Sequence, residues 1–316
     1  MATAFDAAQV AAQAGGPFSG PVNLRDVERW ADSVDLGETV DEMRPAFERL
    51  LRGEAAGSPS TLGRSVTIGI DGLLFGSLTD TWAEAGTVVV WLSDGGYVLG
   101  STESHERMLA YLAVATDLPT FAPRYRHAPK HVWPAQLDDA LAAARAVQRA
   151  GCRLVLGGIS AGGHLALNLA LALARDGTPA DALALLSPNT DRTDKSQTRK
   201  ANTPRDPMVD DEGDRAFAEM AMHHLPDDNP EKSPLLADLS LLPPTHIEVG
   251  GREVLLDDSR LLAEYAAHAG ADVTLNVDED AFHLWQLFTP WLPAANQSLD
   301  RVAAFIREKI GALHKN

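Results

Sequence analysis

Cysteine is almost absent from the chain, whose 316 residues include a single one, Cys152. One cysteine excludes an intrachain disulfide. Cys152 opens an apolar run that continues through Leu154-Val155-Leu156, so we interpret it as a packed core residue rather than a reactive thiol.

Basic side chains are also scarce. Lysine and arginine total 27 against 44 aspartate and glutamate residues, which gives a formal net charge of −17. No cluster of basic residues resembles a phosphate-binding face, so we expect no nucleic-acid partner. An acidic surface weakly repels anions, and this favours a small neutral organic molecule as the substrate.

Long hydrophobic runs are missing as well. No window approaches 18 uncharged apolar residues, so we predict no transmembrane helix and no membrane partner. Residues 1–6 lack the basic and apolar regions of a signal peptide, and we therefore expect a cytoplasmic protein. Hydrophobic residues nevertheless make up 45% of the chain, which is enough for a large buried core.

Strand-like and helix-like segments alternate from residue 64 onward, and Asp71-Gly72 is typical of a hairpin turn after the first of them. Apolar or alternating runs predict strands at 66–70, 87–92, 119–123, 153–157, 182–186, 246–249 and 272–277. Helical spacing predicts helices at 103–116, 134–150, 161–175, 256–269 and 298–312. Such alternation predicts an α/β fold with a mostly parallel sheet and helices on both faces.

Two regions stand outside this alternation. Residues 1–21 are rich in alanine, glycine and glutamine and predict a loosely ordered arm, and two amphipathic helices are expected within 22–53. Residues 188–243 are rich in proline and polar residues and contain one helical stretch. We expect an arm and cap helices at 1–60, and a sheet domain at 61–316 whose insertion at about 188–243 completes a helical cap.

Gly158-Ile159-Ser160-Ala161-Gly162 fits the pattern G-x-S-x-G. A buried strand runs into this pattern and a long helix leaves it, which is the context of a nucleophile elbow. The glycines permit a tight turn that neighbouring strands crowd. We therefore predict that Ser160 is a nucleophile and that the N–H of Ala161 donates to an oxyanion.

A serine hydroxyl needs a base within hydrogen-bond reach, and behind such an elbow the histidine follows the acid in chain order. His283 comes directly after the last predicted strand, where a loop can carry its imidazole over Ser160, whereas His268 lies inside a helix. His223-His224 has no further ligands at suitable spacing, so we predict no metal site. No cofactor is expected either.

Further segments carry a recognisable pattern. Residues 158–167 read GISAGGHLAL, residues 125–131 read YRHAPKH and precede Pro134-Ala135, and Phe282-His283 follows the last strand. These segments resemble GDSAGGHLAL, YRLAPEH…PA and the histidine loop of the hormone-sensitive-lipase-like esterases, the bacterial carboxylesterase and lipase family of the α/β-hydrolase fold. The resemblance implies a mostly parallel eight-stranded sheet with helices on both faces and a helical cap. It also implies a serine hydrolase that cleaves a neutral carboxylic ester through an acyl-enzyme.

The acid of the triad has two candidates. Glu253 stands 30 residues before His283, where the family carries its carboxylate, and glutamate can orient and stabilise an imidazolium as aspartate does. Asp257, one helical turn further on, is the reserve candidate, and its other role would be to stabilise the start of a helix.

The segment that forms the oxyanion hole departs from the family. Ser93-Asp94 stands where the family has His-Gly, although Gly95 and the residues after it match. The backbone N–H groups of Asp94, Gly95 and Ala161 are the predicted oxyanion donors. An ionised carboxylate 4 Å from the oxyanion would repel it by about 4 kcal/mol at an effective dielectric near 20. Asp94 is therefore also a candidate for altered chemistry, and Ile159 departs as well, replacing the elbow's usual aspartate.

Three functions follow from these residues. The first is the serine esterase described above. The second is a repurposed enzyme, a dehydratase or cyclase for example, that uses Asp94 as an acid or base. The third is a ligand-binding protein without chemistry, against which the complete set of nucleophile, base and acid argues.

The substrate pocket is predicted to be apolar, with Tyr97, Ile159 and Trp30 as its candidate lining residues. A homodimer through the last strand and helix, residues 272–312, is compatible with folds of this kind.

Overall fold

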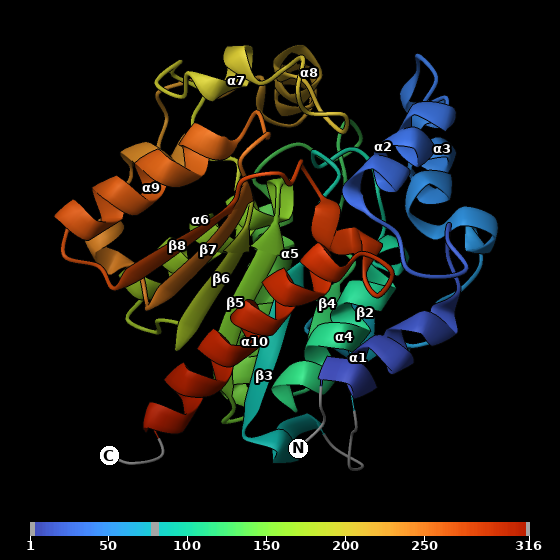
Figure 1. The fold of residues 1–316 in the computed structure, drawn as a ribbon. Helices are drawn as coiled ribbons and strands as arrows, with labels where there is room; N and C mark the ends of the chain where they lie inside the picture. Colours follow the sequence, from blue (N-terminus) through green and yellow to red (C-terminus); the bar gives the residue numbers. More distant parts are fainter. Residues whose placement is uncertain (1–3, 77–81, 314–316) are drawn as a thin grey trace.

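Eight strands pair in the order β1-β2-β4-β3-β5-β6-β7-β8 in a computed structural model that describes residues 4–76 and 82–313 (Figure 1). β1 pairs antiparallel with β2, as β2 does with β4, and the remaining neighbours are parallel. The strands are β1 (Arg64–Ile68), β2 (Ile70–Phe75), β3 (Thr87–Leu92), β4 (Thr120–Pro123), β5 (Arg153–Ile159), β6 (Ala182–Leu186), β7 (Thr245–Gly250) and β8 (Val273–Asp278). The predicted fold class is confirmed.

The hairpin turn lies earlier than Asp71-Gly72, and that prediction is wrong. Gly69 makes the turn with φ +74°, and Ile68 pairs with Ile70 across it. Asp71 and Gly72 belong to β2 instead. A Cβ on Gly72 would lie 2.4 Å from the carbonyl oxygen of Ala122, so this glycine serves the close approach of β4 rather than a turn.

Helices cover both faces of the sheet. α4 and α10 pack against each other on one face, α5 and α6 lie behind the sheet in Figure 1, and α9 packs on β7 and β8. The helices are α1 (Ala4–Ala11), α2 (Leu24–Ser33), α3 (Val40–Arg52), α4 (Glu106–Thr116), α5 (Ala135–Arg149), α6 (Ala161–Arg175), α7 (Thr198–Ala201), α8 (Asp211–Met222), α9 (Leu256–His268) and α10 (Pro293–Leu313).

The N-terminal segment is more ordered than the sequence suggested. A loosely ordered arm was expected at 1–21, but α1 packs on α4 and buries Ala7 and Ala11 completely. Small side chains let the two helices approach closely, which explains a helix in a segment with few large apolar residues. Residues 1–3 lie outside the described residues.

The two expected helices of 22–53 form as α2 and α3. Asn23 caps α2 and Thr39 caps α3, each through a capping box. The side chain of the cap residue accepts from the backbone N–H three residues on, and the side chain of that residue accepts from the backbone N–H of the cap residue. Arg44 of α3 donates hydrogen bonds of 3.0 Å to the carbonyl oxygens of Val98 and Ala128. α3 is therefore tied to the loop that follows β3.

α7 and α8 lie beyond the carboxyl ends of the strands (Figure 1). A buried ion-pair cluster fixes them to α9: Arg199 of α7 contacts Asp214 of α8 and Asp258 of α9, both at 2.7 Å. Because all three side chains are buried, the cluster ties this segment firmly to the sheet domain.

No helix within residues 4–76 and 82–313 is long and apolar enough to cross a bilayer.

Candidate active site

Ser160 occupies the sharp turn between β5 and α6. Its backbone lies at φ 55° and ψ −120°, a strained conformation for a residue with a side chain. The flanking glycines make the turn feasible: a Cβ on Gly158 would lie 2.1 Å from the carbonyl oxygen of Gly162, and one on Gly162 would lie 2.1 Å from that of Leu92. The Ser160 side chain thus stands at the amino end of α6, with 8% of the residue exposed.

His283 lies in the loop after β8 and reaches Ser160. Its Nε2 is 2.8 Å from Ser160 Oγ, and only 3% of the residue is exposed. The backbone N–H of His283 donates a 3.3 Å hydrogen bond to Oδ1 of Asp206, which helps to fix this loop. The imidazole is therefore close enough to accept the hydroxyl proton.

Glu253, in the loop after β7, holds the other side of the imidazole. Its Oε2 lies 2.8 Å from Nδ1 of His283. Its Oε1 accepts hydrogen bonds from the backbone N–H of Gly250 at 2.6 Å and from Ser187 Oγ at 2.7 Å, and the residue is fully buried. With both carboxylate oxygens engaged, Glu253 fixes the imidazole with Nδ1–H facing the carboxylate and Nε2 facing the hydroxyl.

Asp257 is not next to His283. Its carboxylate accepts a hydrogen bond from the backbone N–H of Thr198 and forms an ion pair with Arg260 at 3.6 Å. It lies in the first turn of α9, where a negative charge stabilises the helix. Of the two predicted acids, the structure brings Glu253 to the imidazole and gives Asp257 the alternative role.

The charges around His283 favour its protonated form. Burial alone would lower its pKa, but the hydrogen bond and charge of Glu253, with the charges of Asp206 and Asp94, outweigh burial and raise the pKa to about 9. An imidazolium formed during a reaction would be stabilised in this position.

Asp206 is a carboxyl group of the site that the sequence did not single out. It accepts hydrogen bonds from the backbone N–H groups of His283, Val254 and Met208. Burial, with the nearby charge of Glu253, raises its pKa to about 7 despite the opposing effect of His283. It lies in the irregular segment before α8, where neither spacing nor periodicity distinguishes it from the other aspartates.

Two of the three predicted oxyanion donors have amides that remain available. Within the described residues the N–H groups of Gly95 and Ala161 have no hydrogen-bond partner, and the same holds for Gly96. The N–H of Asp94 instead donates to Nε2 of His105 at 3.2 Å. Gly95 has φ +114°, and a Cβ there would lie 2.1 Å from the carbonyl oxygen of Leu99, so only glycine fits this turn.

The carboxylate of Asp94 faces His105, which immediately precedes α4. Oδ1 of Asp94 lies 2.7 Å from Nε2 of His105, and both residues are buried. Nδ1 of His105 lies 3.0 Å from the carbonyl oxygen of Ser101. No sequence pattern indicates that these two residues pair, since His105 stands 11 positions away in a segment predicted only as a helix.

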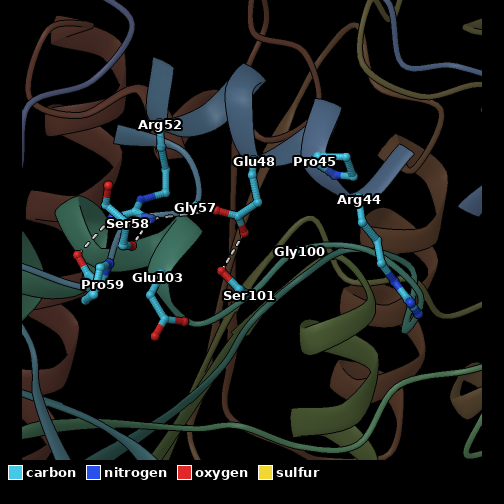
Figure 2. Close-up of a pocket in the computed structure, with 10 residues that line it drawn as sticks. All are labelled: Arg44, Pro45, Glu48, Arg52, Gly57, Ser58, Pro59, Gly100, Ser101 and Glu103. Atoms are coloured by element: carbon cyan, nitrogen blue, oxygen red, sulfur yellow. Dashed lines mark hydrogen bonds and ion pairs between the residues drawn. The ribbon is translucent and has the colours of Figure 1, made fainter. Parts of the chain in front are cut away.

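A hollow of about 480 Å³ lies between α3 and the loop at 100–103 (Figure 2). In Figure 2 the carboxylate of Glu48 from α3 faces Ser101, whose hydroxyl donates a 2.5 Å hydrogen bond to it. Burial raises the pKa of Glu48. The carbonyl of Ser101 accepts from His105, and His105 contacts Asp94. Ser101, in the wall of the hollow, therefore helps to position Asp94.

The three predicted pocket residues have different surroundings. Tyr97, at φ 68°, lies in the loop after β3, called the oxyanion loop because it carries the predicted donors Asp94 and Gly95, and its hydroxyl is 2.5 Å from Nδ1 of His164. Ile159 is fully buried at the end of β5. The indole N–H of Trp30 donates to the carbonyl of Leu50, and its ring packs edge-on against Phe18.

Within the described residues, no group of three or more histidine, cysteine, aspartate or glutamate side chains is arranged to hold a metal ion. The rings of His223 and His224 stack edge to face with centroids 5.5 Å apart.

Comparisons with known proteins agree on one family. The sequence profile of a family described as alpha/beta hydrolase fold matches residues 89–287. An acetyl-hydrolase of Streptomyces hygroscopicus is 34% identical over 249 residues, which cover 76% of this chain and 83% of that protein. An esterase of Acinetobacter venetianus is 32% identical over 231 residues, 71% of this chain and 75% of that protein.

Solved structures agree with the sequence comparisons. The crystal structure of an esterase from the bacterial hormone-sensitive lipase family matches with a TM-score of 0.82 and 31% identity, covering 98% of this chain and all of that one. A mutant of the esterase E40 matches with a TM-score of 0.81 and 33% identity, over 90% of this chain and 96% of that one.

The chain therefore belongs to the α/β-hydrolase-fold family, within the bacterial hormone-sensitive-lipase-like esterases. It is a carboxylesterase-like hydrolase, as the resemblance of its motifs implied.

Proposed function

We propose that this protein is a serine esterase that cleaves neutral carboxylic esters through an acyl-enzyme. Ser160 is the nucleophile, His283 the general base and acid, and Glu253 the residue that orients the imidazole. The observation that carries the proposal is the pair of 2.8 Å contacts that links the hydroxyl, the imidazole and the carboxylate in one line.

In acylation, one proton is transferred, and the bond from the carbonyl carbon to the alcohol oxygen is replaced by a bond to Oγ of Ser160. Oγ of Ser160 attacks the ester carbonyl carbon while its proton passes to Nε2 of His283. The tetrahedral intermediate collapses, the bond from carbon to the alcohol oxygen breaks, and the imidazolium returns the proton to the leaving alcohol. Water then repeats the sequence in place of Ser160, which releases the acid and restores the enzyme.

Gly95 and Ala161 donate their backbone N–H groups to the oxyanion in this proposal, and Gly96 offers a third N–H. Asp94, also predicted as a donor, would first have to release His105. Loss of one such donor in other hydrolases costs about 10²–10³ in rate, so this loop has a large share in catalysis.

Neutral substrates are favoured by the acidic balance of the chain, whose net charge is −17. Ser160, Glu253 and His283 follow β5, β7 and β8 in the chain, and α7 and α8 lie beyond the carboxyl ends of the strands (Figure 1). We propose that the segment 188–243 and the helices of 1–60 together form the cap that selects the substrate.

The non-hydrolytic alternative requires Asp94 to act as an acid or base on a substrate. Its carboxylate is buried and lies 2.7 Å from His105, where a ligand has little access to it. The similarity to proteins named esterase and acetyl-hydrolase also favours hydrolysis.

Rapid mixing with p-nitrophenyl acetate tests the acyl-enzyme. We expect a burst of p-nitrophenol equal to the enzyme concentration, provided deacylation is the slower step, and trapping of an acetylated Ser160 by acid quench. Ser160→Ala should lose the burst and at least about 10⁴-fold in kcat. Ser240→Ala, in the loop before β7, is the matched control and should behave as the parent. Full turnover by Ser160→Ala would overturn the proposal.

A further inference from the structure

Arg252 directly precedes Glu253, the acid of the triad, and has no part in the chemistry proposed above. Its backbone N–H donates to the carbonyl oxygen of Ala281 at 3.0 Å. This hydrogen bond joins the loop that carries Glu253 to the loop that carries His283. The side chain of Arg252, of which 27% is exposed, makes further contacts with the surroundings of the imidazole.

The guanidinium of Arg252 binds the segment before α8. Its Nε and Nη2 both donate to the carbonyl oxygen of Arg205, at 3.1 and 2.8 Å. This carbonyl belongs to the peptide bond that leads into Asp206. Because the carboxylate of Asp206 accepts from the backbone N–H of His283 at 3.3 Å, Arg252 fixes the segment that supports the histidine loop.

The guanidinium also lies over the ring of Phe282, with its central carbon 5.9 Å from the ring centre. Such a contact between a cation and an aromatic face is favourable. Phe282 is completely buried and directly precedes His283. The backbone of Arg252 therefore continues into Glu253, while its side chain contacts the residue before the histidine.

The remaining guanidinium nitrogen, Nη1, binds the carboxylate of Glu28 in α2. Glu28 has 23% of its side chain exposed, so this ion pair is partly shielded from solvent. α2 is itself held in place, since the indole N–H of Trp30 donates to the carbonyl of Leu50 in α3 at 2.8 Å. The ion pair thus connects the N-terminal helices to the loops of the triad.

We propose that Arg252 is a positioning residue of the triad, and that its ion pair with Glu28 connects helix α2 of the cap to the loops that hold the acid and the base. This inference rests on the proposed esterase function and adds a residue that acts through others. A guanidinium suits this task because its planar fork presents five N–H donors in fixed directions. A catalytic group that is misplaced by about 1 Å can cost about 10²-fold in rate.

Arg252→Met tests the positioning role, because it retains an unbranched apolar side chain and removes every guanidinium donor. With ethyl acetate as the substrate, we expect kcat to fall by about 10–100-fold. KM should change by less than about threefold, since the triad rather than ground-state binding is disturbed. Arg260→Met is the matched control and should keep the kcat of the parent, because Arg260 pairs with Asp257 at 3.6 Å.

The profile of kcat/KM against pH separates positioning from a purely structural role, since the midpoint of its rising limb reports the pKa of His283. Burial lowers this pKa, but Glu253, followed by Asp206 and Asp94, raises it above the ordinary value. Removing the positive charge of Arg252 would by itself raise the pKa further. Looser contacts of Glu253 and Asp206 lower it instead, so we expect the limb of Arg252→Met to move to lower pH.

Two further variants resolve the contributions of the fork and of the cap. Arg252→Lys keeps the charge and can still pair with Glu28, but it lacks the fork, so it should recover part of the lost kcat. Glu28→Gln should lower kcat by about two- to fivefold, because the ion pair is partly exposed. In the Arg252→Met background, Glu28→Gln should have no further effect, and additive effects would overturn the link to α2.

An unmoved limb in Arg252→Met, with or without a loss of kcat, would overturn the positioning role. Thermal unfolding shows whether each variant is folded. If Arg252→Met does not fold, unchanged kcat and an unmoved limb in both Arg252→Lys and Glu28→Gln would overturn the role in its place.

Labelling of Ser160 by a fluorophosphonate separates this failure from that of the esterase proposal. If the parent takes the label and cleaves ethyl acetate while the variants match it in kcat and pH profile, only the positioning role is wrong. If the parent neither takes the label nor cleaves the ester, the proposed function fails, and the role of Arg252 fails with it.

Discussion

Nδ1 of His283 lies 2.8 Å from Oε2 of Glu253, and Glu253 has no exposed surface. The other oxygen of this carboxylate is held by Gly250 and Ser187, so the carboxylate cannot rotate away from the imidazole. The orientation of the imidazole therefore depends on one buried glutamate, which also contributes most to raising the pKa of His283, ahead of Asp206 and Asp94.

Glu253→Gln should lower kcat by about 10³–10⁴-fold, because an amide in this place no longer stabilises the imidazolium and can favour the wrong tautomer. Steady-state kinetics with ethyl acetate measures the loss. Asp257→Asn is the matched control, since Asp257 binds Thr198 and Arg260 instead of the imidazole, and it should keep most of the activity. The reverse order of effects would make Asp257 the acid.

The activity should rise with pH up to about pH 9. His283 must be neutral to accept the proton of Ser160, and its pKa of about 9 delays deprotonation into the alkaline range. The profile of kcat/KM against pH, measured by titration of the released acid, shows this rising part as a limb whose midpoint is the pKa of His283. A limb near the ordinary histidine pKa of about 6.5 would contradict the stabilisation that we assign to Glu253.

Asp206→Asn should move the same limb to lower pH. The substitution keeps an oxygen that can accept from the N–H of His283 but removes a charge that favours the imidazolium. The maximum rate above the limb should change little, because Asp206 does not contact Ser160 by any hydrogen bond. An unchanged limb would show that Asp206 acts on the loop alone.

Asp94→Gly should raise kcat/KM a few-fold, since it removes a carboxylate next to the oxyanion loop and keeps the backbone N–H of position 94. The gain stays well below the repulsion expected of a carboxylate that faces the oxyanion, because this carboxylate faces His105. Loss of all esterase activity in a folded Asp94→Gly protein would instead make Asp94 a participant in the chemistry.

Arg199→Met should lower the free energy of unfolding by about 3–5 kcal/mol, because it leaves two buried carboxylates without this partner. Urea unfolding measures the change. Arg145→Ala removes an ion pair with Asp176 at the surface, where both side chains are about half exposed, and should cost less than about 1 kcal/mol. Equal losses would show that the buried cluster does not hold α7 and α8.

Much of the fold and the triad could be predicted from the sequence, and for a physical reason. Parallel strands end at the same edge of a sheet, so residues directly after three predicted strands, Ser160, Glu253 and His283, converge there. The resemblance placed the acid at Glu253, 30 residues before His283, and kept Asp257 in reserve, because the sequence alone does not say which carboxylate the loop after β7 turns inward.

Residues of the irregular segments could not be predicted in the same way. Asp206 and His105 lie in loops and short turns, where no period relates a residue's position to the direction of its side chain. The hairpin turn is predicted at Gly72 but lies at Gly69, because a glycine that makes a turn and a glycine that leaves room for a neighbouring strand look alike in sequence. The helix α1 was missed because alanine contacts leave a weak apolar pattern.

The most direct test of the account is the site of covalent labelling by a fluorophosphonate. Trypsin releases Ser160 in the peptide of residues 154–175, in which it is the only serine, so mass spectrometry assigns the label without ambiguity. The account predicts stoichiometric labelling of this peptide in the parent, parallel loss of ester turnover, and no label in Ser160→Ala. An unlabelled Ser160 in a preparation that still cleaves esters would contradict it.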